Sequence, residues 1–109
     1  MTIEKAKVGM THARERAIAE LRRMVLCAIG DHDAAVWLFG SCARGDVKGN
    51  SDIDIGVLPR EEISPEFFAD LAARIEDSEI PYDVDLFDLR YVEPALMGAV
   101  QREGVMWRK

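Results

Sequence analysis

The sequence contains no apolar run that approaches the ~20 residues needed to cross a bilayer. The first residues, Met1-Thr2-Ile3-Glu4-Lys5, also lack the apolar core of a secretory signal peptide. We therefore expect a cytoplasmic protein that makes no use of a membrane.

Cysteine is scarce as well. The only two cysteines, Cys27 and Cys42, have neither the spacing of metal ligands nor that of a secreted disulfide framework. Hydrophobic residues make up 49% of the chain, which is enough for one core without a disulfide or a structural metal. Two free thiols in a reducing compartment are expected.

The chain also lacks linkers, repeats and low-complexity segments, so we expect its 109 residues (1–109) to form a single domain. Residues 1–10 show no clear period and are interpreted as a frayed lead-in. Positive charge is in the minority, and the net charge is −6. Residues 1–30 sum to +3, which leaves −9 for the remainder. A region of such negative charge repels the phosphate backbone of nucleic acids, so direct nucleic-acid binding is not expected.

The pattern of apolar residues predicts an α+β fold. Ile18, Leu21, Val25 and Ile29 recur at helical spacing, and Gly30 ends that helix. Further elements are predicted as strands over 34–39, 51–58 and 82–87, helices beginning at Pro65 and Pro94, and an edge strand over 105–107. This order implies a small mixed sheet with helices packed against it in two layers.

Two aspartates mark a candidate metal site. Alternate strand residues point to opposite faces, so Asp52 and Asp54 share one face while Ile53 and Ile55 take the other. Two carboxylates about 7 Å apart on a half-buried face repel each other, and a divalent cation removes that repulsion. Hard oxygen ligands of this kind suit Mg²⁺.

A phosphate-binding turn is predicted just before these aspartates. Gly40 and Ser41 follow the buried strand, where glycine lets a phosphate approach the backbone and the hydroxyl can hold its oxygens. Arg44 lies within reach of the same phosphates. Asp46, which follows Gly45, either caps a turn or contacts the site.

A third carboxylate would complete a two-metal arrangement. In the strand predicted over 82–87, Asp83 and Asp85 share a face, whereas Asp88 falls on the opposite one. We choose Asp85, between Val84 and Leu86, as the third ligand and general base. Asp83 is the fallback because it lies at the start of the strand, and Asp88 is expected to be a surface or capping residue.

These residues resemble the signature of the polymerase-β-type nucleotidyltransferase superfamily. Gly40-Ser41 is followed by ten residues, then by Asp52-x-Asp54 and a later apolar–Asp–apolar strand. The longer string from Leu38 to Asp54 resembles the minimal nucleotidyltransferase (MNT) family within it, and the ending Glu103-Gly104-Val105-Met106 also matches.

The resemblance implies a polymerase-β-like fold, two Mg²⁺ ions and ATP as substrate. MNT proteins often pair with HEPN-domain ribonucleases in toxin–antitoxin systems, and transfer AMP from ATP to a tyrosine of the toxin. Carried over to this chain, the nucleotide-binding residues would be Gly40, Ser41 and Arg44, and the metal ligands would be Asp52, Asp54 and Asp85.

Two other functions remain open. A small-molecule nucleotidyltransferase would need a second subunit to hold its acceptor, and a binding-only antitoxin would keep a vestigial site. The basic residues Arg22 and Arg23 on the first helix are either a solvated face or a docking surface for an acidic partner.

Overall fold

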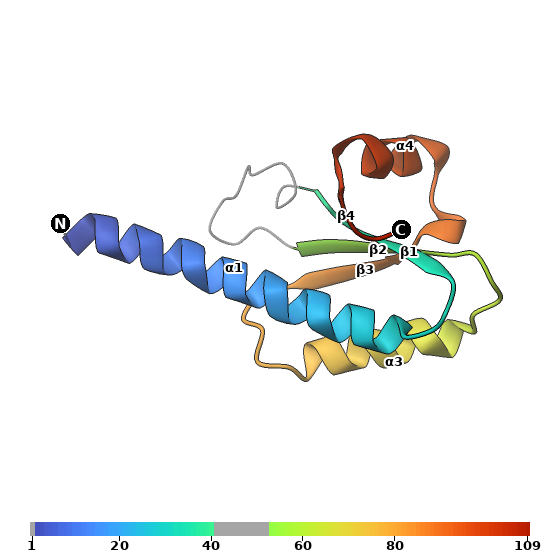
Figure 1. The fold of residues 1–109 in the computed structure, drawn as a ribbon, viewed down its shortest axis with the longest axis horizontal. Helices are drawn as coiled ribbons and strands as arrows, with labels where there is room; N and C mark the ends of the chain where they lie inside the picture. The colour runs from blue at the N-terminus through green and yellow to red at the C-terminus, as the bar shows by residue number, and fades with distance from the viewer. Residues whose placement is uncertain (1, 41–52) are drawn as a thin grey trace.

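The computed structural model describes residues 2–40 and 53–109, with side chains described from residue 13 onward. Its elements follow the order α1 (Thr2–Ile29), β1 (Ala34–Phe39), β2 (Ile53–Pro59), α3 (Pro65–Glu76), β3 (Val84–Asp88), a 3-10 turn η1 (Leu89–Tyr91), α4 (Pro94–Glu103) and β4 (Val105–Arg108). Figure 1 shows this arrangement, with α1 as the longest element.

The strands form one mixed sheet in the order β3-β2-β1-β4. Strand β1 pairs antiparallel with both β2 and β4, whereas β2 and β3 run parallel. A parallel pair needs a crossover connection, and α3 supplies it. The predicted α+β fold with a small mixed sheet is therefore confirmed, as is the edge position of the last strand.

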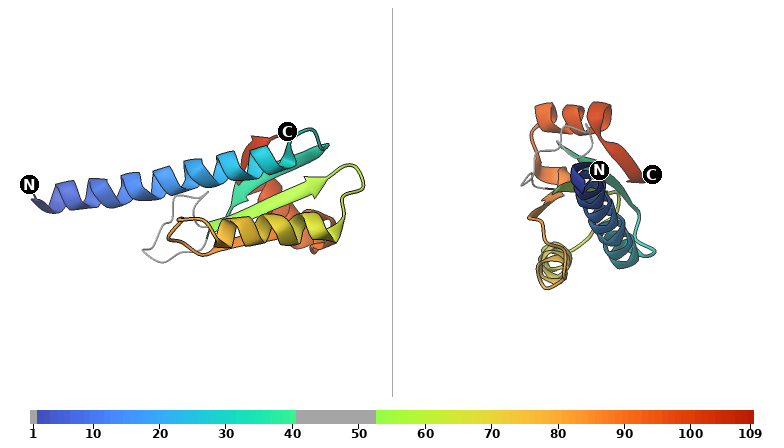
Figure 2. Two further views of the ribbon diagram at one scale, coloured as in Figure 1. Left: turned by 90° about the horizontal axis from the view of Figure 1, so that it is seen from below. Right: turned by 90° about the vertical axis from the view of Figure 1, so that its left-hand side faces the viewer.

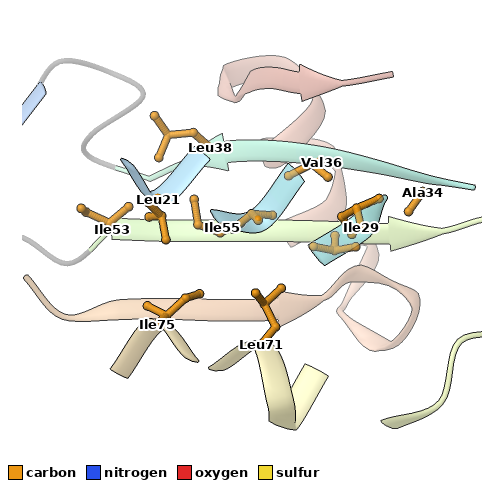
Figure 3. Packing of buried hydrophobic residues seen from close by; sticks show 11 residues of the cluster. Leu21, Ile29, Ala34, Val36, Leu38, Ile53, Ile55, Leu71 and Ile75 are labelled. Atoms are coloured by element: carbon orange, nitrogen blue, oxygen red, sulfur yellow. The ribbon is translucent and has the colours of Figure 1, made fainter. Parts of the chain in front are cut away.

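The main core lies between one face of the sheet and the two helices α1 and α3. Its buried residues include Leu21, Val25 and Ile29 from α1, Leu71 and Ile75 from α3, and Ile53, Ile55 and Val57 from β2 (Figure 3). The α1 residues follow the helical spacing predicted from the sequence, and the β2 residues alternate with residues of the opposite face.

A smaller core covers the opposite face, where α4 and η1 pack through Val100 and Leu89 against Ala35, Trp37 and Phe39 of β1. All six residues of β1 are buried, since this central strand is covered on both faces. Figures 1 and 2 show α4 on the far side of the sheet from α1 and α3. The sequence predicted helices packed against a sheet, but did not distinguish this further layer.

Proline and glycine mark the helix boundaries as predicted. Pro65 and Pro94 occupy first-turn positions of α3 and α4, where the missing N–H is not needed. Gly30, at φ 53°, ends α1 by donating its N–H to the Leu26 carbonyl at 3.0 Å.

Two boundaries differ from the prediction. Helix α1 begins at Thr2, so residues 2–10, interpreted from the sequence as part of a frayed lead-in, belong to the helix. It extends past the sheet toward the N-terminus (Figures 1 and 2). Strand β3 begins at Val84, two residues later than expected.

None of the helices in the described ranges has the length and hydrophobicity of a membrane span.

Candidate active site

The sheet brings two of the predicted carboxylates together. Asp54 is the second residue of β2 and Asp85 the second residue of β3, and the two lie directly in register across the parallel pair. Neighbouring strands are about 4.8 Å apart, so these side chains leave the sheet side by side. Their neighbours Ile53, Ile55 and Val84 pack into the main core, which places both carboxylates on the opposite face.

Gly40 borders the Asp54 carboxylate. It directly follows β1, whose last residue Phe39 is paired with Asp54, and it has φ 80°, a conformation that side chains other than glycine rarely adopt. A Cβ built on Gly40 would overlap Asp54 Oδ2 and lie 3.2 Å from Cγ. Glycine is therefore required both for the backbone turn and for the space that the carboxylate occupies.

The site has an apolar border and an open side. On the same face, the rings of Phe39 and Phe87 pack with centroids 5.2 Å apart. Asp54 is half-buried, whereas Asp85 and Asp83 are exposed. Asp83 lies outside β3, and its carbonyl accepts a hydrogen bond from the Ile53 N–H at 2.9 Å. Exposure therefore does not distinguish Asp83 from Asp85. The register with Asp54 is what distinguishes Asp85.

The donor set fits a divalent cation. Asp54 and Asp85 present carboxylate oxygens from adjacent strands beside a glycine whose missing Cβ leaves room for them. Mg²⁺ takes one or two such carboxylates and completes its shell with water and substrate phosphates. Within the part of the chain that the structure describes, no three His, Cys, Asp or Glu side chains are grouped as a metal site.

The remaining predicted site residues, Ser41, Arg44 and Asp52, lie outside the described residues, as does Asp46. Asp88, predicted to be a surface or capping residue, caps η1 by accepting from the Arg90 N–H at 3.1 Å and pairs with its guanidinium at 2.7 Å. This ion pair raises the pKa of Arg90 above its ordinary value. Trp37 of β1 is buried.

A cavity of about 490 Å³ lies between the end of α3 and the start of β3. Its lining includes Asp83 and Asp85 together with Ile75, Glu76 and Tyr82, but not Asp54. Because α3 covers the face of the sheet opposite to the carboxylate pair, this cavity lies at the β3 edge and does not lie between the two carboxylates.

Sequence reasoning missed Arg14, the only charged residue with described side chain that is buried, at 8% exposed. Its guanidinium lies over the ring of Tyr82, 4.5 Å from the centroid. The available signal was its position one turn before Ile18, which puts a charged residue on the apolar stripe of α1.

A match to a family model decides the assignment of the chain. Residues 31–107 match the family described as "Polymerase beta, Nucleotidyltransferase". The chain belongs to the polymerase-β nucleotidyltransferase family. The matched range covers β1, β2 and β3, all of β4 except Arg108, and both carboxylates of the site.

This chain is similar to individual proteins of known name. It is 38% identical over 69 residues to protein adenylyltransferase MntA of Shewanella oneidensis, covering 63% of this chain and 49% of the relative. It spans about half the length of the curated relatives it matches.

Two solved complexes resemble the fold. A toxin–antitoxin complex with AMP-PNP shows a TM-score of 0.64 at 30% identity, covering 79% of this chain and 71% of the other. A complex of tri-AMPylated Shewanella oneidensis HEPN toxin with MNT antitoxin shows a TM-score of 0.62 at 26% identity, covering 85% and 70%. This nucleotidyltransferase is thus a homologue of the MNT antitoxins of HEPN toxin–antitoxin pairs.

Proposed function

We propose that this chain is a protein adenylyltransferase that moves AMP from ATP to a hydroxyl, most specifically a tyrosine, of a HEPN-type ribonuclease toxin, and so acts as an antitoxin in the cytoplasm. The observation that carries the proposal is the register of Asp54 with Asp85 beside Gly40. The likeness to MntA adds the acceptor class, and the complex with AMP-PNP adds the nucleotide class.

In this proposal, Gly40, Ser41 and Arg44 hold the triphosphate, and Asp52, Asp54 and Asp85 ligate two Mg²⁺ ions. Bound Mg²⁺ supplies Lewis-acid stabilisation of the α-phosphate and of the leaving pyrophosphate. Asp85, on the exposed side of the pair, accepts the proton of the acceptor hydroxyl. The hydroxyl oxygen then forms its bond to the α-phosphorus as the bond to the pyrophosphate oxygen breaks.

The acceptor is proposed to be a macromolecule because the carboxylate pair lies at an open edge of the sheet. Asp85 is exposed and lies on β3, which has a neighbouring strand on one side only. A protein acceptor brings its own surface to such a site, whereas a small molecule would need walls that a second subunit would have to provide.

The test is intact-mass spectrometry of a HEPN partner after incubation with this chain, ATP and Mg²⁺. The partner should gain one or more AMP units. Asp54→Asn and Asp85→Asn should each lower the rate by at least about 100-fold, since each removes a metal-binding oxygen charge. Asp70→Asn, which removes an exposed carboxylate on α3, is the matched control and should transfer at the wild-type rate.

The same experiment separates the alternatives. A stable complex without any mass gain would replace the transferase by a binding-only antitoxin. Neither complex nor mass gain would redirect the search to a small-molecule acceptor.

A further inference from the structure

Arg14 is buried in the structure, and the role argued for it below rests on the proposed function only where catalysis is measured. An arginine at 8% exposure is unusual, since burying a charge is costly unless other groups stabilise it. One such group is the face of Tyr82, because a cation over an aromatic ring is attracted by the ring electrons. Arg14 lies on α1 and Tyr82 in the connection from α3 to β3, so the contact joins two distant parts of the sequence.

The contact bears on the beginning of β3. Tyr82 lies two residues before the strand and packs against the main core together with Val84 and Leu86. The contact between Arg14 and Tyr82 therefore anchors the start of β3, and it does so on the face of the sheet that α1 and α3 cover. On the opposite face, three residues after Tyr82, Asp85 leaves the strand next to Asp54.

Strand β3 needs such support because it is a short strand at the edge of the sheet. It has five residues and one neighbour, β2, and Asp85 is only its second residue. Strand ends open more readily than strand centres, since fewer hydrogen bonds hold them. Before β3 the backbone bond from the Ile53 N–H to the Asp83 carbonyl, at 2.9 Å, adds one further tie.

We propose that Arg14 is a positioning residue for the active site. Through its contact with Tyr82 it fixes the start of β3, and thereby holds the Asp85 carboxylate in register with Asp54. Arg14 does not touch the reacting atoms in this proposal. Its loss displaces one carboxylate of the pair without removing any charge from the site itself.

The test compares Arg14→Ala with Arg16→Ala, which removes an exposed arginine from the same helix. Amide hydrogen exchange is measured first, because it needs neither nucleotide nor partner. Exchange over Val84–Leu86 should rise at least about tenfold in Arg14→Ala and stay at the wild-type rate in Arg16→Ala. Far-UV circular dichroism establishes that both variants are folded.

Two Tyr82 variants keep the test informative if Arg14→Ala does not fold. Tyr82→Phe retains the ring face and should exchange like wild type, whereas Tyr82→Leu removes it and should exchange like Arg14→Ala. Unchanged exchange in both Arg14→Ala and Tyr82→Leu would overturn the proposal.

Catalysis provides the second readout. In Arg14→Ala, kcat for AMP transfer should fall by about 100-fold with a small change in the KM for ATP, because a carboxylate is displaced while the triphosphate contacts are kept. If wild type transfers AMP and Arg14→Ala matches it, the positioning role is wrong. If wild type transfers none, the proposed function fails, and the exchange experiment still decides the role of Arg14.

Discussion

At the scale of single residues, Gly40 shows how narrowly the site is built. Its φ of 80° is a backbone conformation that other residues rarely adopt. The carboxylate of Asp54 occupies the space that a side chain on residue 40 would need. A substitution here acts on the backbone and on the carboxylate at the same time. The residue therefore links the end of β1 to the chemistry proposed for β2.

Gly40→Ala should abolish most AMP transfer and lower the free energy of unfolding by about 1–3 kcal/mol, since the methyl group overlaps Asp54 Oδ2 and the positive φ becomes strained. Transfer is measured by mass spectrometry and stability by urea unfolding.

Gly98→Ala is the matched control for this substitution. Its new Cβ would meet the flexible end of Arg102 at 3.0 Å, and alanine favours a helix over glycine by about 1 kcal/mol. It should therefore keep activity and be at least as stable as wild type. Equal activity of the two variants would remove Gly40 from the site.

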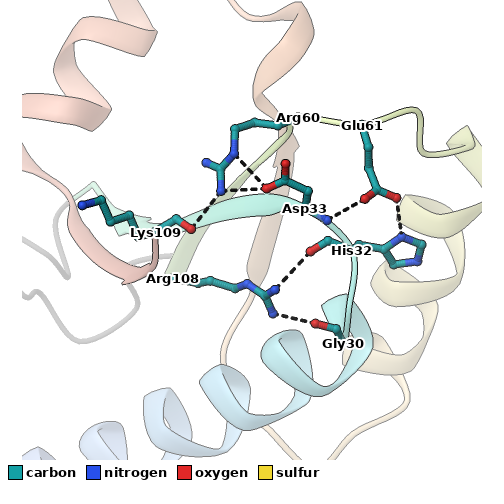
Figure 4. A network of polar contacts seen from close by, with 7 residues as sticks. All are labelled: Gly30, His32, Asp33, Arg60, Glu61, Arg108 and Lys109. Atoms are coloured by element: carbon teal, nitrogen blue, oxygen red, sulfur yellow. Dashed lines mark hydrogen bonds and ion pairs between the residues drawn. The ribbon is translucent and has the colours of Figure 1, made fainter.

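At the scale of elements, a polar cluster joins the ends of β1, β2 and β4 away from the carboxylates (Figure 4). Glu61 accepts from the Asp33 N–H at 2.8 Å and contacts His32 Nδ1 at 3.0 Å. Arg60 donates to Asp33 at 2.9 Å, and Arg108 donates to the Gly30 carbonyl at 2.7 Å. These bonds tie the turn after α1 to two strand ends.

The Asp33 N–H, followed by His32, lowers the pKa of Glu61 below its ordinary value of 4.5. A carboxyl group with a lowered pKa in the folded state contributes stability above pH 4.5, and this contribution is lost as the pH falls through the folded value. Urea unfolding at several pH values should therefore show a loss of stability below pH 4.5 that is smaller in Glu61→Gln.

Glu62→Gln, at the next position, should keep the wild-type pH dependence and serves as the control. Identical pH profiles for Glu61→Gln and wild type would show that the cluster contributes nothing to acid sensitivity.

At the scale of the whole molecule, charge is divided unevenly. Residues 1–30 carry +3 within a chain of net charge −6. A groove of about 410 Å³ lies between α1 and β4. Its lining includes the exposed residues Arg22 and Arg23 and the apolar Leu26 from α1, and Trp107 from β4. Arg23 also pairs with Glu20. A groove that combines apolar contacts with basic side chains favours an acidic surface on the proposed HEPN partner.

The double variant Arg22→Glu with Arg23→Glu reverses both charges and should slow association with that partner. The association rate should also depend less on salt concentration, since electrostatic attraction acts mainly on the encounter rate. Association is followed by surface plasmon resonance at two ionic strengths. The control, Arg74→Glu with Arg102→Glu, changes net charge equally on α3 and α4. Equal rates for the two double variants would remove α1 from the interface.

Local features of the site can be predicted from the sequence, whereas the contacts that bring its parts together depend on the whole molecule. The alternation in β2 predicted that Asp54 lies on the face opposite to Ile53 and Ile55, and the structure places it there, because parity is a local property of a strand. The pairing of β3 with β2, which makes them neighbours, depends on the whole sheet. Arg14 was overlooked because helix spacing shows which side of a helix is covered, but not which aromatic ring lies there.

The parallel register of β2 and β3 determines whether a folded molecule has the carboxylate pair. If β3 slipped by one residue, Val84 or Leu86 would stand beside Asp54 on the opposite face, and Asp85 would turn into the apolar layer. Such a molecule would keep its helices and most of its buried surface, yet it would have no carboxylate pair. The specific activity of a refolded sample would therefore report the fraction of molecules with native strand register, which circular dichroism cannot distinguish.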